Sequence, residues 1–191
     1  MFIQTEPTPN PLTLKFLPGR VVMEEGTAFF QNKSDCSNSP LASRLFSIED
    51  VVGVFFGSDF VTITQKENSD WQILKPMILG AIMDHYNSGE QTIIDSEDDS
   101  ENDATTLTES ENENSTIIKK IKELLDTRVR PAVAMDGGDI VFQGFEEGIV
   151  YLHMQGACSG CPSSTATLKM GIENMLKHYV PEVKEVRPID V

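Results

Sequence analysis

An acidic tract in the second half of the sequence constrains how this chain can fold. Residues 95–114 read DSEDDSENDATTLTESENEN and contain nine acidic residues, with Leu107 as the single large apolar one. Such a segment cannot bury enough apolar surface to offset the entropy of ordering it, and its like charges repel one another. We therefore expect an acidic, disordered linker over residues 91–114, between an N-terminal domain over 1–90 and a C-terminal domain over 115–191.

The charge of the chain excludes some classes of ligand. Thirty acidic against fifteen basic residues give a formal net charge of −15, which repels phosphate backbones and anionic membrane surfaces. The longest apolar stretches, such as residues 51–56, fall far short of the roughly 20 residues that a membrane-spanning helix needs. We expect a soluble protein with neither nucleic acid nor membrane as a partner.

The N-terminal block predicts a small α/β domain. Residues 12–16 alternate between apolar and polar side chains, which is typical of a half-buried strand. Residues 51–56 and 60–64 are rich in β-branched and aromatic side chains and are joined by a short Gly-containing loop, which indicates a hairpin. Trp71 and Leu74 lead into a helical stripe of apolar side chains, with Pro76 expected in the first turn of the main helix and Ser88-Gly89 expected to end it. The stripe consists of Ile78, Ala81, Ile82 and His85. We find no ligand cluster or catalytic constellation in this block.

The C-terminal block predicts the element order α-β-β-α-β. Ser115 is the expected N-cap of a first helix, and Pro131 is expected to limit its extent. Strands are indicated over residues 140–144 and 149–155, and the second of these alternates apolar and polar side chains. A helix follows, and a last short strand lies around residues 183–186. The fold class is therefore α/β, in the α+β sense, with two small domains.

A pair of cysteines carries the chemistry of the C-terminal block. The segment GACSGCPSS, residues 156–164, lies between the end of a strand and the start of a helix. Cys158 and Cys161 can bind one metal centre from a tight turn, in which Gly160 relieves backbone strain and Pro162 suits the first helical position. The positive end of the helix is expected to lower the pKa of both thiols and to favour the negative charge of a thiolate-bound cluster.

The number of cysteines limits which kinds of metal site this pair can form, but several kinds remain open. Four cysteine ligands are usual for an iron–sulfur cluster and for a structural zinc site, whereas this pair supplies half of them. Two copies related by a two-fold axis would complete the set. The open alternatives are a dithiol/disulfide oxidoreductase, a zinc site, an inert pair, or an adaptor that uses only its N-terminal domain and acidic tract. Cys36, in a polar stretch, is expected to be an incidental free thiol.

Three segments of the C-terminal block together resemble the signature of a known family. Arg130-Pro131, the segment MDGGD over residues 135–139 and the segment GACSGCPSS over residues 156–164 look like the NifU C-terminal, or Nfu, domain. The N-terminal block is similar to the domain that precedes it in alphaproteobacterial and mitochondrial Nfu proteins, through Thr8-Pro9-Asn10-Pro11 and Asp84-His85-Tyr86. The resemblance spans nearly the whole chain outside the linker.

The resemblance implies an iron–sulfur cluster scaffold or carrier and not an enzyme. Cys158 and Cys161 match the metal-ligating positions of the family, so the resemblance implies a [4Fe–4S] cluster bridging a homodimer. Apo iron–sulfur proteins would receive the cluster, and upstream assembly proteins would supply it. The first thirty residues look like neither a signal peptide nor a transit peptide. We therefore expect the bacterial cytoplasm, with the mitochondrial matrix as the alternative for a processed eukaryotic form.

Overall fold

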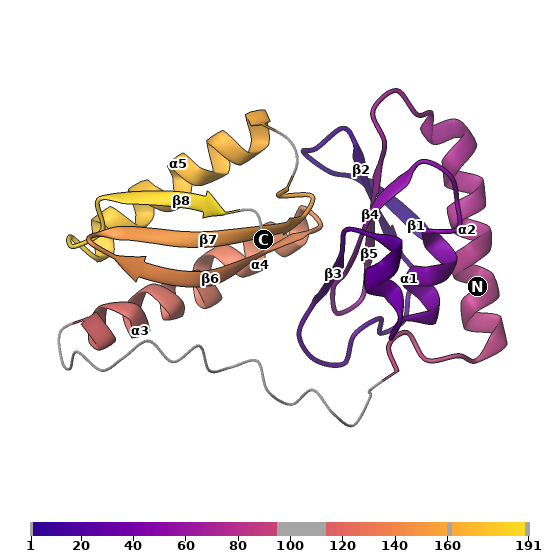
Figure 1. The fold of residues 1–191 in the computed structure, drawn as a ribbon, viewed down its shortest axis with the longest axis horizontal. Helices are drawn as coiled ribbons and strands as arrows, with labels where there is room; N and C mark the ends of the chain where they lie inside the picture. The colour runs from indigo at the N-terminus through magenta and orange to yellow at the C-terminus, as the bar shows by residue number, and fades with distance from the viewer. Residues whose placement is uncertain (1, 95–113, 160–161, 190–191) are drawn as a thin grey trace.

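The computed structural model describes residues 2–94, 114–159 and 162–189 (Figure 1). Buried apolar side chains form two separate cores, one from the N-terminal part of the chain and one from the C-terminal part. This arrangement confirms the α+β class with two domains. The expected linker falls, apart from its ends, outside the described residues, so the domain boundaries stay predictions. No helix among the described residues is long and apolar enough to cross a membrane.

The N-terminal domain is an antiparallel sheet backed by helices. The strands follow the order β1-β2-β5-β4-β3 across the sheet. Their bounds are β1 Gln4–Pro7, β2 Thr13–Leu17, β3 Ala28–Phe30, β4 Val51–Phe56 and β5 Val61–Gln65. The helices are a 3₁₀ turn over Lys33–Cys36, α1 Pro40–Leu45 and α2 Trp71–Ser88.

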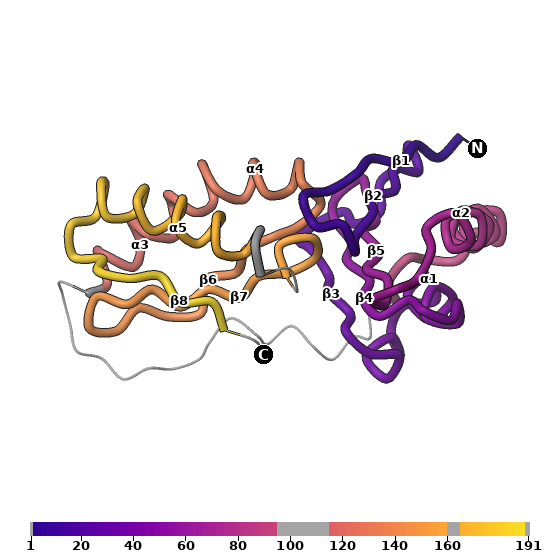
Figure 2. Tube along the Cα trace, turned by 90° about the horizontal axis from the view of Figure 1, so that it is seen from above, coloured from indigo at the N-terminus to yellow at the C-terminus, as the bar shows by residue number. Residues whose placement is uncertain are grey.

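The sheet of this domain has two different faces, because side chains alternate along each strand. One face packs against the helices, and the other points away from them. Phe16, Val54 and Ile63 point into the core beneath α1 and α2. Their strand neighbours Lys15 and Thr62 therefore point to the opposite face, which lies toward the C-terminal domain (Figure 2). The predicted strand over 12–16 and the predicted hairpin are confirmed.

Helix α2 corrects the placement of Pro76. The helix begins at Trp71, where the side chain of Asp70 accepts a hydrogen bond from the backbone N–H of Gln72. Pro76 therefore lies in the second turn of the helix, whereas the sequence predicted it in the first turn. Because proline has no N–H, the helix forgoes one internal hydrogen bond there. The helix ends at Gly89, which adopts the left-handed conformation common at this position.

His85, near the end of α2, makes the stability of the N-terminal domain dependent on pH. Its side chain is fully buried, and neither ring nitrogen has a hydrogen-bond partner among the described residues. Burial lowers the pKa of His85 below 6.5, Arg44 lowers it further, and Glu90 opposes both. The folded domain thus prefers neutral His85, and this contribution to stability is lost as the pH falls below the pKa of the unfolded chain, about 6.5.

A His85→Phe substitution tests this dependence. We expect the variant to gain stability relative to the unsubstituted protein as the pH falls from about 7.5 to about 5.5, because phenylalanine has no proton to take up. The measurement is the free energy of unfolding by denaturant at each pH. A difference that stays constant over this range would contradict the prediction.

The C-terminal domain has the predicted order α-β-β-α-β. Three strands form a sheet in the order β6-β7-β8, with β6 antiparallel and β8 parallel to β7. The helices lie on one side of this sheet (Figure 2). The bounds are α3 Asn114–Leu124, a π-helical segment Leu125–Val129, α4 Arg130–Met135, β6 Gly138–Glu146, β7 Ile149–Gly156, α5 Pro162–Tyr179 and β8 Glu185–Ile189.

Pro131 does not end the first helix of this domain, contrary to the prediction. The chain stays helical from α3 through the π-helical segment into α4, and the N–H of Arg130 bonds to the carbonyl of Leu125. This wider turn precedes Pro131, which occupies the first turn of α4, where a missing N–H costs little.

Strands β6 and β7 form a hairpin that ends at the cysteine segment. Glu147 and Gly148 connect the strands, and both have positive φ, as a tight two-residue hairpin turn requires. The pairing runs from Glu146 opposite Ile149 to Gly138 opposite Gly156, with one irregularity near Phe142. Alternate residues of β7 are buried, which confirms the predicted face.

Candidate metal centre

Cys158 lies in a tight loop between β7 and α5, as the sequence predicts. Gly156 turns the chain with φ 62°, and the N–H groups of Cys158 and Ser159 bond to the carbonyls of Gln155 and Gly156. The N–H of Ala157 bonds to the carbonyl of Gly137, which ties the cysteine loop to the turn before β6. Cys161 lies outside the described residues, so its position beside Cys158 stays a prediction.

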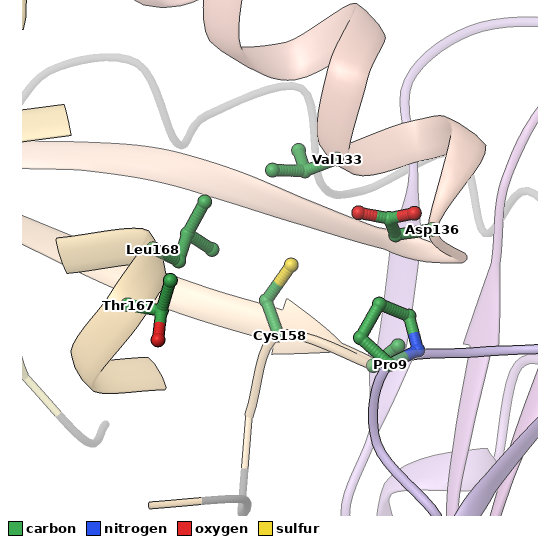
Figure 3. A pocket seen from close by; sticks show the side chains of 7 residues that line it. Pro9, Val133, Asp136, Cys158, Thr167 and Leu168 are labelled. Atoms are coloured by element: carbon green, nitrogen blue, oxygen red, sulfur yellow. The ribbon is translucent and has the colours of Figure 1, made fainter. Parts of the chain in front are cut away.

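The side chain of Cys158 borders a cavity of about 450 Å³. Figure 3 shows its sulfur pointing into the space between Val133, Leu168 and Asp136. Pro9, from the N-terminal domain, forms part of the same wall. Only 5% of Cys158 is exposed to solvent, and the residue is part of the second core. A soft sulfur donor with largely apolar surroundings suits a thiolate-bound metal centre.

The pKa of Cys158 differs from the sequence-based expectation. Burial, followed by the nearby charges of Asp136 and Asp139, raises it to about 12. The predicted lowering by the helix is therefore wrong for the metal-free protein, since desolvation outweighs the helix dipole. The thiol is protonated at neutral pH, and a metal must displace its proton to bind. Such a thiol is also a poor redox nucleophile, because disulfide exchange needs an accessible thiolate.

The turn before β6 approaches the cysteine closely. A Cβ atom on Gly138 would lie 2.5 Å from Cys158 Sγ and 2.8 Å from the carbonyl oxygen of Gln155. The next residue, Asp139, is buried and receives two hydrogen bonds from Arg130, at 2.8 and 2.9 Å. This pairing raises the pKa of Arg130 above its usual range. Asp139 thus ties the start of β6 to helix α4.

The N-terminal domain contributes side chains to both loops beside Cys158, which the sequence analysis missed. Asn10 Nδ2 donates to the carbonyl of Ser159 at 3.0 Å, and Thr62 Oγ1 donates to the carbonyl of Gly137 at 2.8 Å. Lys15 Nζ donates to the carbonyls of Ala134 and Met135 at 3.3 and 3.1 Å. The available signal was the polar Lys15 and Thr62 in strands otherwise suited to a buried sheet.

Cys36 is a free thiol, as expected, but it is not at the surface. It is 1% exposed and part of the first hydrophobic core. Burial, helped by Asp35, raises its pKa to about 11. The residue is therefore a packing residue and is not part of the candidate metal centre.

The fold and the site together define a class of protein. A cysteine at a strand-to-helix loop beside a cavity offers one thiolate of the kind that zinc and iron–sulfur sites use. Comparison with known proteins narrows this class. Residues 3–89 match the family described as "Scaffold protein Nfu/NifU N terminal", and residues 121–187 match the "NifU-like domain".

Known relatives are similar along the entire chain. "NifU-like protein 4, mitochondrial" of Arabidopsis thaliana is 56% identical over 188 residues, which are 97% of this chain and 65% of the relative. "NifU-like protein 5, mitochondrial" of the same plant is 55% identical over 97% of this chain and 67% of its own length. "NFU1 iron-sulfur cluster scaffold homolog, mitochondrial" of Drosophila erecta is 50% identical over 190 residues, which are 99% of this chain and 65% of the relative.

The chain belongs to the Nfu/NifU-like family. It spans 65% to 67% of the length of these three relatives.

Proposed function

We propose that the protein is an iron–sulfur cluster scaffold and carrier. Cys158 and Cys161 of two copies would together hold one [4Fe–4S] cluster, which the protein then delivers to apo iron–sulfur proteins. The observation that carries the proposal is the free Cys158 thiol beside a cavity at the strand-to-helix loop. Family membership and the scaffold named in the relatives support it.

The residues around Cys158 have separate roles in this proposal. Deprotonated Cys158 supplies a thiolate ligand, and the N-terminal end of α5 stabilises the negative charge of the bound cluster. Val133 and Leu168 line the cavity and limit the access of water to the cluster. Transfer proceeds by ligand exchange, in which thiolates of the recipient replace the two cysteines one after the other. No catalysed bond rearrangement is required, so we propose a carrier and not an enzyme.

The dithiol oxidoreductase is the second candidate, since it would use the same cysteines. A reactive redox cysteine is usually exposed and has a lowered pKa. Cys158 is buried, and its pKa is raised to about 12. This combination favours the cluster carrier over the redox protein.

The location and partners follow from the same proposal. The names of all three relatives contain the word mitochondrial, which supports the mitochondrial alternative over the bacterial cytoplasm that the sequence analysis preferred. We propose a second copy of the chain, upstream assembly proteins and apo recipient proteins as partners.

Anaerobic reconstitution with iron and sulfide tests the proposal. We expect about two irons and two sulfides per chain, in a species with the mass of a dimer, because one [4Fe–4S] cluster would be shared between two chains. The iron and sulfide content and the mass in solution are measured on the same sample. A colourless monomer with a readily reduced disulfide between Cys158 and Cys161 would instead establish the redox candidate.

A further inference from the structure

The outer face of the N-terminal sheet holds both loops that surround Cys158. Asn10 bonds to the carbonyl of Ser159 in the cysteine loop, and Thr62 bonds to that of Gly137 in the facing turn. Thr27 Oγ1 also donates to Asp139 Oδ2 at 3.0 Å. One domain therefore fixes both sides of the other domain's metal-ligating loop.

Lys15 makes several contacts across the face between the two domains. The residue is only 7% exposed, and its ammonium group lies 4.4 Å from the centre of the Phe60 ring. It donates to the last two carbonyls of α4, those of Ala134 and Met135, at the negative end of the helix dipole. The carbonyl of Ala134 also accepts the N–H of Gly137. A buried ammonium needs such partners, because leaving it desolvated and unpaired is costly.

Asn10 is also held in position by several hydrogen bonds. It is 1% exposed, its Oδ1 accepts the N–H of Leu12, and its own carbonyl accepts hydrogen bonds from Thr8 and Thr13. The amide is therefore held in place by its own loop before it reaches Ser159.

The contact between the domains is suited to separation. The two hydrophobic cores do not merge across it. The contact combines side-chain hydrogen bonds to backbone carbonyls with the buried ring of Phe55, which packs closely against Gly156. Interfaces between domains of one chain resemble transient protein–protein interfaces, and water replaces their hydrogen bonds when they open.

We propose that the N-terminal domain is a detachable cap over the metal-ligating loop, docked in the metal-free protein and released when a cluster is bound between two chains. The inference rests on the proposed function, because a shared cluster requires the Cys158 sulfurs of two chains to meet at one centre. Cys158 is nearly inaccessible, and Pro9 of the N-terminal domain forms part of its wall. That wall must move before a second chain reaches the sulfur.

Alkylation of the metal-free protein tests the docking directly. In a Cys161→Ser background only Cys36 and Cys158 react, and the rate at each is followed by mass spectrometry of peptides after iodoacetamide treatment. We expect Lys15→Met to raise the rate at Cys158 at least severalfold, and the double variant Asn10→Ala with Lys15→Met to raise it further. Lys66→Met, at an exposed position beyond β5, is the matched control and should change nothing.

Cys36 reports whether the N-terminal domain stays folded. It lies in the core of that domain, so opening of the cap leaves its rate unchanged, whereas unfolding raises it. The proposal is overturned if the double variant leaves the Cys158 rate unchanged, or if the Cys36 and Cys158 rates rise together.

Cluster loading separates this proposal from the proposed function. With both cysteines restored, Lys15→Met should load iron and sulfide faster than the unsubstituted protein and reach the same final content. Equal loading rates overturn the release of the cap on cluster binding. If the unsubstituted protein takes up no cluster at all, the proposed function fails, while the alkylation rates still decide whether the domain is docked over Cys158.

Discussion

A Cys158→Ser variant is expected to retain essentially no cluster after anaerobic reconstitution. A cysteine binds a metal as its thiolate, and a hydroxyl group does not replace a thiolate at neutral pH. Because a shared cluster takes the same residue from both chains, one substitution removes half of the ligands. Iron and sulfide per chain, together with the visible absorption of the cluster, measure the loss. Cys161→Ser should have the same effect, and an undiminished cluster in either variant would overturn the ligand assignment.

Cys36→Ala is the matched control for this experiment. Cys36 is buried in the other core, so its loss should leave the cluster content unchanged. The free energy of unfolding completes the comparison. Cys158 is part of the second core. A serine there places a hydroxyl group among apolar neighbours, and we expect Cys158→Ser to cost about 1–2 kcal/mol of stability as well.

Gly138→Ala is expected to destabilise the C-terminal domain by about 1–3 kcal/mol, the usual cost of overpacking. The added methyl group would lie 2.5 Å from Cys158 Sγ, 2.8 Å from the carbonyl oxygen of Gln155 and 3.0 Å from the backbone nitrogen of Cys158. Two of these neighbours are backbone atoms, which cannot rotate away. The strands or the cysteine loop must therefore shift, and the cluster content should fall together with the stability.

Gly171→Ala provides the control for the glycine experiment. Gly171 is exposed in α5, and a Cβ atom there would meet nothing within 4 Å. Alanine in an open helical position stabilises by about 0.5–1 kcal/mol relative to glycine. The free energy of unfolding by denaturant should thus change in opposite directions in the two variants. A Gly138→Ala protein as stable as the original would show that the close approach to Cys158 carries no strain.

Much of the C-terminal domain could be predicted because its elements are long and strongly periodic. Alternation along residues 149–155 indicated which face of β7 is buried, and the cysteine segment between a predicted strand and a predicted helix indicated the strand-to-helix loop in which Cys158 lies. In the N-terminal domain, β1, β3 and α1 escaped prediction because elements of three to six residues contain too few repeats of either period. Tertiary pairing, and not local pattern, determines such short elements.

The surroundings of Cys158 could not be predicted, because they depend on residues distant in the sequence. Lys15 looked like the polar residue of a half-exposed strand, yet its amine is satisfied by carbonyls of α4. The sign of the pKa shift of Cys158 was wrong for the same reason. Helix position is visible in a sequence, whereas the burial of Cys158 in the second core and its proximity to Asp136 and Asp139 are not.

The two-residue turn at Glu147 and Gly148 lies at the far end of the hairpin from Cys158, yet it determines where Cys158 lies relative to the sheet. Side chains alternate along β7, so a shift of its pairing with β6 by one residue would turn the apolar face outward and move Cys158 to a different height above the sheet. The turn fixes that pairing through two positive φ angles. An insertion or deletion at this turn would therefore displace Cys158, which the turn does not touch, and a screen for loss of cluster binding should recover changes there as well as at the cysteines.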